Sequence, residues 1–281
     1  MINQIKTVML LGLLTALLLW VGQLVGGASG LTAAFVIVLL MNFIMYWFSD
    51  KIVLAMYRAK PAHKNSELYA LVKETSKEAG LPMPKVYMIP SNNPNAFATG
   101  RNPKNSAVAC TDGILNLLSK EELKGVIAHE LSHIKNRDTL ITTIAATIAG
   151  VIAYVAAMAR WAAIFGGFGG RDRDDNNILS LLVLAVLTPL IATIIQLAIS
   201  RQREYIADAT AAKITKKPVH LADALIKIEQ GIKLHPMAMG SEATSSLFIA
   251  NPFRGAGLLN LFSTHPPIKE RVARLKAMKI Q

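Results

Sequence analysis

The chain has few charged residues and almost no cysteine. Asp, Glu, Lys and Arg make up 17% of its 281 residues, whereas soluble domains carry about 25%. No charged residue occurs in 7–49, 139–159 or 176–200. About 20 apolar residues span a bilayer as a helix, so a purely soluble enzyme is nearly excluded, and the same hydrophobicity argues against a disordered chain. The single cysteine, Cys110, rules out an intrachain disulfide.

Positive charge is abundant but unevenly distributed. The formal net charge is +12, and 13 of the 30 Lys and Arg residues lie in 49–138 and another 13 in 200–281. This asymmetry is typical of the positive-inside rule for membrane proteins. We expect no nucleic-acid partner, because the basic residues are scattered and no groove-reading module occurs.

A pair of transmembrane helices is predicted at the N-terminus. The run 7–49 is too long for one span and is interrupted by three glycines within 26–30. We therefore expect helices over about 7–25 and 31–48, joined by a tight turn. The alternative is a cleaved signal peptide, but the first apolar stretch exceeds the usual length of about 7–15 residues and a second stretch follows at once.

A second pair of transmembrane helices is predicted at about 139–165 and 178–200, on either side of a loop at 166–177. The alternative is a buried helical hairpin inside a soluble domain. Small residues such as Ala145 and Ala149 keep this alternative open, because they could also pack against protein.

The segment between the two pairs, 49–138, is expected to be soluble. Its pattern predicts a helix over 66–79, short strands over 85–89 and 106–110, a loop over 90–103, and a further helix from Ser119 with Glu122 in a capping box. The last segment, 201–281, is also basic. Its pattern predicts helices over 201–213, over 221–233 and after the Pro266-Pro267 pair, with a long loop over 235–264.

The most informative motif is His129-Glu130-Leu131-Ser132-His133. Two histidines four residues apart lie on one face of a helix, so both imidazoles can bind one metal ion. Glu130 lies one position round the helix, where it can contact a water at the metal without being a ligand. The alternative is an amphipathic helix with two surface histidines.

Catalytic zinc usually has three protein ligands, so the two histidines need a partner. No further histidine follows at the metzincin distance. Glu204 and Asp208 offer two carboxylates on one helical face. We expect Glu204 to be the third ligand and Asp208 to accept a hydrogen bond from a ligand imidazole. By itself such a pair is more typical of a solvated helix face, but two membrane crossings between His133 and Glu204 would return the chain to the same side.

This arrangement predicts peptide hydrolysis. Zinc lowers the pKa of a bound water from about 15.7 to about 7, and Glu130 can accept the proton as the water attacks a carbonyl and then protonate the leaving amine. A structural zinc site would more typically use several cysteines, and the chain has only Cys110.

With these residues, the chain resembles the HtpX family of membrane zinc metalloproteases and, more distantly, the CAAX prenyl endopeptidases. The resemblance covers essentially the whole chain, including both helix pairs. Its motifs are Asn95-Ala96-Phe97-Ala98-Thr99-Gly100, the segment 129–133, the segment 203–208, and Thr264-His265-Pro266-Pro267 with Arg271.

The resemblance implies one Zn²⁺ per chain, bound by His129, His133 and Glu204, with Glu130 catalytic. It implies that the protease domain and both termini face the cytoplasm at a bacterial inner membrane. There the enzyme would degrade misfolded or damaged membrane proteins in a stress-linked quality control.

The resemblance also suggests further site residues. Asn95, Ala96, Phe97 and Ala98, together with the strand over 106–110, would form the edge to which an extended peptide adds as a strand. The same segment is equally compatible with a surface turn. His265 and Arg271 could approach the site and stabilise the oxyanion, the alternative being a helix-start histidine and a solvated arginine.

The predicted fold is a mainly α membrane protein with two transmembrane helices in 1–48 and two in 139–200. A zincin-like α+β cytoplasmic protease domain is formed by 49–138 and 201–281 and is split by the two-span insertion. The predicted function is that of a membrane-bound zinc endopeptidase, with polypeptide substrates and the lipid bilayer as partners. The alternative is a non-catalytic membrane adaptor whose metal site only joins the two soluble halves.

Overall fold

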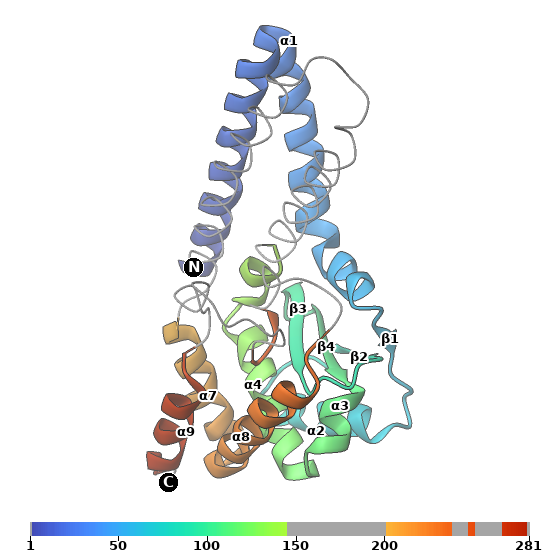
Figure 1. Cartoon of the computed structure of the whole chain (residues 1–281), viewed down its shortest axis with the longest axis vertical. Helices are drawn as coiled ribbons and strands as arrows, with labels where there is room; N and C mark the ends of the chain where they lie inside the picture. The colour runs from blue at the N-terminus through green and yellow to red at the C-terminus, as the bar shows by residue number, and fades with distance from the viewer. Residues whose placement is uncertain (1, 145–200, 238–246, 251–265, 280–281) are drawn as a thin grey trace.

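The computed structural model describes residues 2–144, 201–237, 247–250 and 266–279 (Figure 1). Its elements are α1 (Ile2–Met56), β1 (Lys60–Pro61), α2 (Glu67–Glu78), β2 (Lys85–Ile89), β3 (Ala96–Asn102), β4 (Asn105–Thr111), α3 (Asp112–Leu117), α4 (Lys120–Lys135), α7 (Arg201–Thr215), α8 (Pro218–Leu234) and α9 (Ile268–Ala277). The predicted helix pair over 139–200 lies outside the described residues except for a helical start at 139–144. Most of the predicted loop over 235–264 also lies outside them.

Helix α1 is broken where the glycines predicted a turn. Gly27 has φ 55° and ψ −138°, a conformation that a residue with a side chain rarely adopts. The chain reverses there, so α1 forms two antiparallel arms (Figure 1). Asn42 Nδ2 in the second arm donates a hydrogen bond of 3.0 Å to Thr15 Oγ1 in the first. By length and composition, the segment Gly27–Ile44 could cross a membrane, and 6% of it is buried within the protein.

The four strands form one sheet in the order β1-β2-β4-β3. β1 pairs antiparallel with β2, β2 parallel with β4, and β4 antiparallel with β3. The strand predicted over 85–89 is confirmed, and the strand predicted over 106–110 is one residue longer at each end. The predicted loop over 90–103 is wrong in its second half, because β3 occupies Ala96–Asn102. Its Ala and Gly residues carry little strand propensity, and pairing with β4 determines its conformation.

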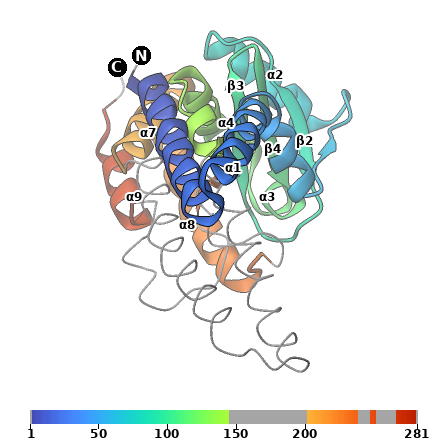
Figure 2. The same cartoon turned by 90° about the horizontal axis from the view of Figure 1, so that it is seen from above.

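The two faces of the sheet pack against different elements. Val86, Val108 and Cys110 face a core formed with α2, α4 and α8. Phe97 and Ala109 alternate with these residues and face the opposite side, where they pack against the end of α1 and residues 247–248. In Figures 1 and 2, α4 lies between the sheet on one side and α7 with α9 on the other. This central position places α4 against α7 and β3, which contribute further residues to the candidate site.

The helices of segments 49–138 and 201–281 begin close to their predicted positions. The side chain of Ser66 caps α2 by accepting a hydrogen bond from the backbone N–H of Tyr69. Ser119 and Glu122 form the predicted capping box at the start of α4. α7, α8 and α9 confirm the three helices predicted in the last segment.

Candidate metal centre

The two histidines of the motif lie one turn apart on α4 and face α7. His129 is fully buried, and its Nε2 atom lies 3.1 Å from Nε2 of His133. Their rings meet edge to face, with centroids 4.7 Å apart. The four-residue spacing therefore directs both imidazoles to one point, as expected for a helix.

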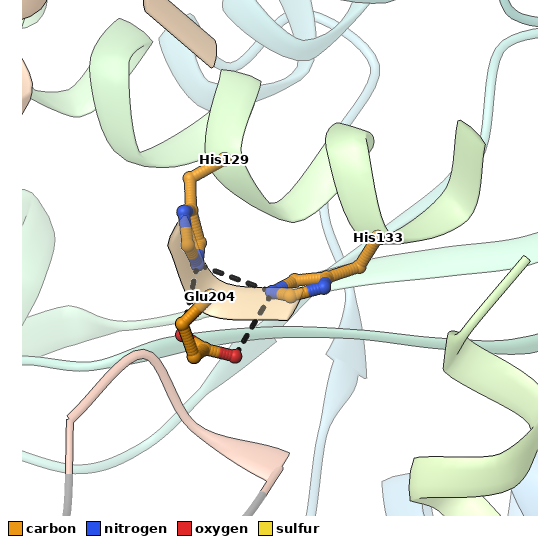
Figure 3. Close-up of side chains that lie close together, drawn as sticks. All are labelled: His129, His133 and Glu204. Carbon is orange, nitrogen blue, oxygen red and sulfur yellow. Dashed lines mark hydrogen bonds and ion pairs between the residues drawn. The ribbon is translucent and has the colours of Figure 1, made fainter. Parts of the chain in front are cut away.

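Glu204 approaches the same point from the first turn of α7 (Figure 3). Its Oε2 atom lies 3.5 Å from Nε2 of His129, and its Oε1 atom lies 3.6 Å from Nε2 of His133. Glu204 is 7% exposed. His129, His133 and Glu204 therefore form a cluster that could bind a metal ion. One potential ligand atom of each lies within 4.8 Å of those of the other two.

The spacing of these ligand atoms fits a metal ion. In a tetrahedral zinc site with metal–ligand distances of about 2.0–2.1 Å, neighbouring ligand atoms lie about 3.3 Å apart. The three separations here are 3.1, 3.5 and 3.6 Å. Two imidazoles and one carboxylate are also a known ligand set of catalytic zinc, which leaves one position open.

A buried ion pair contacts Nδ1 of His129, the ring nitrogen that does not face His133. Asp208, one turn after Glu204 on α7, lies 2.9 Å from Nδ1 of His129 through its Oδ1 atom. Arg271 on α9 donates to both carboxylate oxygens of Asp208, through Nε at 2.9 Å and Nη2 at 2.7 Å. Burial alone raises the pKa of Asp208, but the adjacent Arg271 guanidinium outweighs it and holds this pKa at about 2. An ionised Asp208 keeps the proton of His129 on Nδ1, which leaves Nε2 available to a metal.

His133 has a carboxylate partner that the sequence analysis missed. Asp138, which follows the end of α4, places Oδ2 3.1 Å from Nδ1 of His133 and is 2% exposed. Burial lowers the pKa of His133, but the carboxylates of Asp138 and Glu204 outweigh it and raise this pKa to about 10. The same negative charge that favours a protonated imidazole also favours a divalent cation. The available signal in the sequence was an acidic residue five positions after His133.

Glu130 lies between the metal-site face of α4 and β3. It is 2% exposed, and the backbone N–H of Ala98 is close enough to its carboxylate to lower its pKa. Burial raises the pKa of Glu130, while the neighbouring imidazoles of His129 and His133 act in the opposite direction without cancelling it. The carboxylate is thus next to both histidines and shielded from bulk water.

The expected substrate-binding segment is only partly at the site. Asn95, Ala96 and Phe97 are all fully buried. Phe97 packs against Tyr57 and Phe248 on the far face of the sheet, so its side chain is part of the core there, and its expected place in a substrate-binding edge stays a prediction about the backbone. Asn95 donates from Nδ2 to the carbonyl of residue 250 at 2.8 Å, which is a structural contact.

The edge of the sheet is also placed differently from the prediction. β4 lies between β2 and β3, so the strand over 106–110 is interior, and β3 is the edge strand on this side of the sheet within the described residues. Along this edge, the Ala96 carbonyl accepts from the Ile249 N–H at 3.1 Å and the Gly100 carbonyl accepts from Thr139 Oγ1 at 2.9 Å. Ala98 lies between these two contacts, next to Glu130.

Arg271 reaches the site, but its donors point at protein groups. It is fully buried, and besides Asp208 it donates from Nη1 to the Ile249 carbonyl at 3.0 Å. This arrangement fits support of the ligands rather than contact with a reacting oxyanion. His265 lies outside the described residues.

Comparisons with known proteins show the family of the chain. The profile of Peptidase family M48 matches residues 62–279. The chain is 54% identical over 278 residues to a Protease HtpX homolog of Syntrophotalea carbinolica, covering 99% of each chain. It is 50% identical over 279 residues to a Protease HtpX homolog of Pyrococcus furiosus, covering 99% of this chain and 96% of the relative. The crystal structure of S. mikatae Ste24p has a similar fold, with a TM-score of 0.52 and 20% identity, over 97% of this chain and 65% of the other.

Proposed function

The chain belongs to peptidase family M48, and from this premise we propose that it hydrolyses peptide bonds at the cluster of His129, His133 and Glu204. It is a membrane metalloprotease related to the HtpX proteases over nearly its full length. The observation that carries the proposed site is the convergence of three ligand atoms from α4 and α7 at separations of 3.1–3.6 Å.

We assign Zn²⁺ as the metal, with His129, His133 and Glu204 as its ligands. Imidazole nitrogen and carboxylate oxygen suit this borderline-soft ion, and the separations fit its tetrahedral geometry. When bound, zinc supplies Lewis acidity, which polarises a carbonyl and makes water more acidic. Asp208 and Asp138 orient the two imidazoles by accepting from their Nδ1 atoms.

Glu130 is the proposed general base. Its raised pKa and its position beside both histidines suit a carboxylate that takes a proton from the attacking water. As the water oxygen bonds to the carbonyl carbon, Glu130 accepts the proton. It then donates that proton to the amide nitrogen as the C–N bond breaks, which releases an acid and an amine.

The substrate is proposed to lie along the outer edge of β3. An extended peptide can add to a sheet edge through backbone hydrogen bonds, and Ala98 is the position of this edge that lies beside Glu130. This places the substrate-binding role on the backbone at Ala98, with Asn95 and Ala96 holding the segment 249–250 in place.

The membrane arrangement is proposed to comprise four spans, with both parts of the protease domain on the cytoplasmic side of the bacterial inner membrane. His133 and Glu204 flank the segment 139–200, yet their side chains approach to 3.6 Å. A segment that crosses a bilayer about 30 Å thick must therefore cross it an even number of times. Misfolded membrane proteins of the stressed cell are the proposed substrates, since the site would face the cytoplasmic ends of their spans.

Casein cleavage by the full chain tests the proposed chemistry. The protein is purified in detergent with a zinc chelator, and the reaction is started with zinc. Glu130→Gln should bind zinc but cleave about 10²–10⁴-fold more slowly. Glu121→Gln, an exposed carboxylate on the first turn of the same helix, should cleave like the wild type. Equal cleavage by Glu130→Gln and the wild type would refute the role of Glu130. If the wild type and both variants bind zinc but none of them cleaves casein, a structural metal site is favoured.

A reporter test addresses the proposed topology. A reporter that is active only in the periplasm, inserted within 166–177, should give a signal, since this loop would lie between two crossings. A reporter that is active only in the cytoplasm should be silent at the same position. The opposite pair of results would contradict the four-span arrangement.

A further inference from the structure

A cavity lies where the second arm of α1 meets the sheet. Its volume is about 470 Å³, and its walls include the aromatic side chains of Phe43, Trp47 and Phe48. All three aromatic residues are at least 40% exposed. They fall at or just beyond the end of the apolar segment Gly27–Ile44, the position at which aromatic residues mark a membrane–water interface.

Three cationic side chains line the same cavity, namely Lys51, Lys85 and Arg101. The Arg101 guanidinium lies 4.0 Å from the ring centroid of Trp47, and the Lys51 ammonium lies 5.0 Å from that of Phe48. In the part of the chain that the structure describes, none of the three forms an ion pair with a carboxylate. Asp50 is the one acidic residue among the lining residues, so the cavity has a net charge of +2.

This combination suits a ligand that is anionic at one end and apolar at the other. An arginine stacked on an aromatic ring keeps the N–H groups at its edge available for a phosphate. The apolar wall formed by Phe43 continues into the proposed membrane span, which a free phosphate or an acidic peptide would not use. Basic residues just outside a membrane helix attract anionic lipids in the same way.

We propose that this cavity binds the headgroup of an anionic phospholipid. The phosphate would lie against Arg101 and Lys51, and the acyl chains would follow the apolar surface of α1 past Phe43. The proposal rests on the proposed membrane insertion of α1. It assigns the aromatic residues around Trp47 a role distinct from the metal centre, although Arg101 shares β3 with Ala98.

Lipid titration of the full chain in detergent tests the proposal. Phosphatidylglycerol should raise the midpoint of thermal unfolding in a saturable way, whereas phosphatidylcholine and glycerol 1-phosphate should not. The double variant Lys51→Gln/Arg101→Gln should bind phosphatidylglycerol about 25-fold more weakly, on the basis of about fivefold for each cation removed. Lys73→Gln/Lys77→Gln removes two exposed lysines of α2 and should bind like the wild type.

Three results would overturn the proposal: equal stabilisation by phosphatidylcholine, equal stabilisation by glycerol 1-phosphate, or binding by the Lys51/Arg101 double variant within threefold of the wild type. If the double variant does not fold, Lys51→Gln alone should still bind about fivefold more weakly. An alkaline wash of phosphatidylcholine vesicles carrying the protein tests insertion separately. Release by the wash would contradict the proposed membrane arrangement, whereas retention without a lipid preference would contradict only the lipid site.

Discussion

Replacing Asp208 by asparagine tests whether a buried ion pair supports the metal centre. In the wild type, Asp208 accepts from Nδ1 of His129 and from two nitrogens of Arg271, at 2.7–2.9 Å. Asparagine keeps the shape but removes the charge. It also presents an N–H₂ group to one of these donors. The buried Arg271 guanidinium therefore loses its nearest compensating charge and keeps the Glu204 carboxylate, whose Oε2 atom lies 3.5 Å from Nη1.

The expected cost has two parts. Breaking a buried ion pair by removing one partner costs about 3–5 kcal/mol, which corresponds to a fall of about 6–20 °C in the midpoint of thermal unfolding. Removing the hydrogen-bond acceptor of a ligand imidazole lowers metal affinity by about 10–100-fold. The first effect is measured on metal-free protein in detergent, and the second by competition for zinc with a chromophoric chelator.

Two further variants separate the ion pair from other effects. Asp208→Leu/Arg271→Met removes both charges and should be destabilised by less than the sum of the two single changes, because each single change leaves a buried charge without its partner and the double variant does not. Asp223→Asn removes a carboxylate that is 42% exposed and lies 3.7 Å from Lys276. It should change stability by less than about 1 kcal/mol. Wild-type zinc affinity in Asp208→Asn, or additive costs in the double variant, would refute the reasoning.

Three other predictions concern residues away from the metal. Burial raises the pKa of Cys110 far above its usual range, so its thiol should react with a maleimide only after unfolding; rapid labelling of the native protein would contradict this. Burial raises the pKa of Glu122, but the Lys227 ammonium and the hydrogen bonds from Ser119 together outweigh it, so the net shift of this pKa is downward. Ionised Glu122 therefore adds stability above its unfolded pKa of about 4.3, and this stability is lost as the pH falls through the lower folded pKa. Thermal unfolding should show Glu122→Gln about 1 kcal/mol less stable at pH 7 and equal to the wild type in strong acid, and a difference independent of pH would argue against the pair. A Cβ atom at Gly113 would lie 2.2 Å from the Asn92 carbonyl oxygen, so Gly113→Ala should cost about 1–3 kcal/mol, and an unchanged midpoint of unfolding would show that this loop yields freely.

Much of the local structure was predictable from the sequence. The spacing of His129 and His133 determined that both imidazoles share one face of α4, and Ser119 with Glu122 predicted where that helix begins. The glycines around Gly27 predicted the break in α1. These features depend on residues within about one helical turn of each other, where backbone geometry alone relates sequence to position.

The choice of Glu204 as third ligand came from the residues and from the two membrane crossings expected between it and His133, and the resemblance to a known family implied the same ligand. The resemblance added the segment 95–98 as a candidate substrate-binding edge. It did not separate the residues of 95–98 by role. Phe97 and Ala98 are neighbours in a strand, so their side chains lie on opposite faces of the sheet, and only the packing of α1 and Phe248 shows which face is core.

The tertiary structure alone decided how the site is supported. Asp138 meets His133 because the chain turns after α4, and Arg271 meets Asp208 across 63 positions because α9 packs beside α7. It also decided that β3 rather than β4 is the edge strand within the described residues. The sequence by itself determined which groups could bind a metal, through the regular geometry of single helices. Which carboxylate, guanidinium and peptide group surround them depended on contacts between distant segments, which form only when the whole core packs.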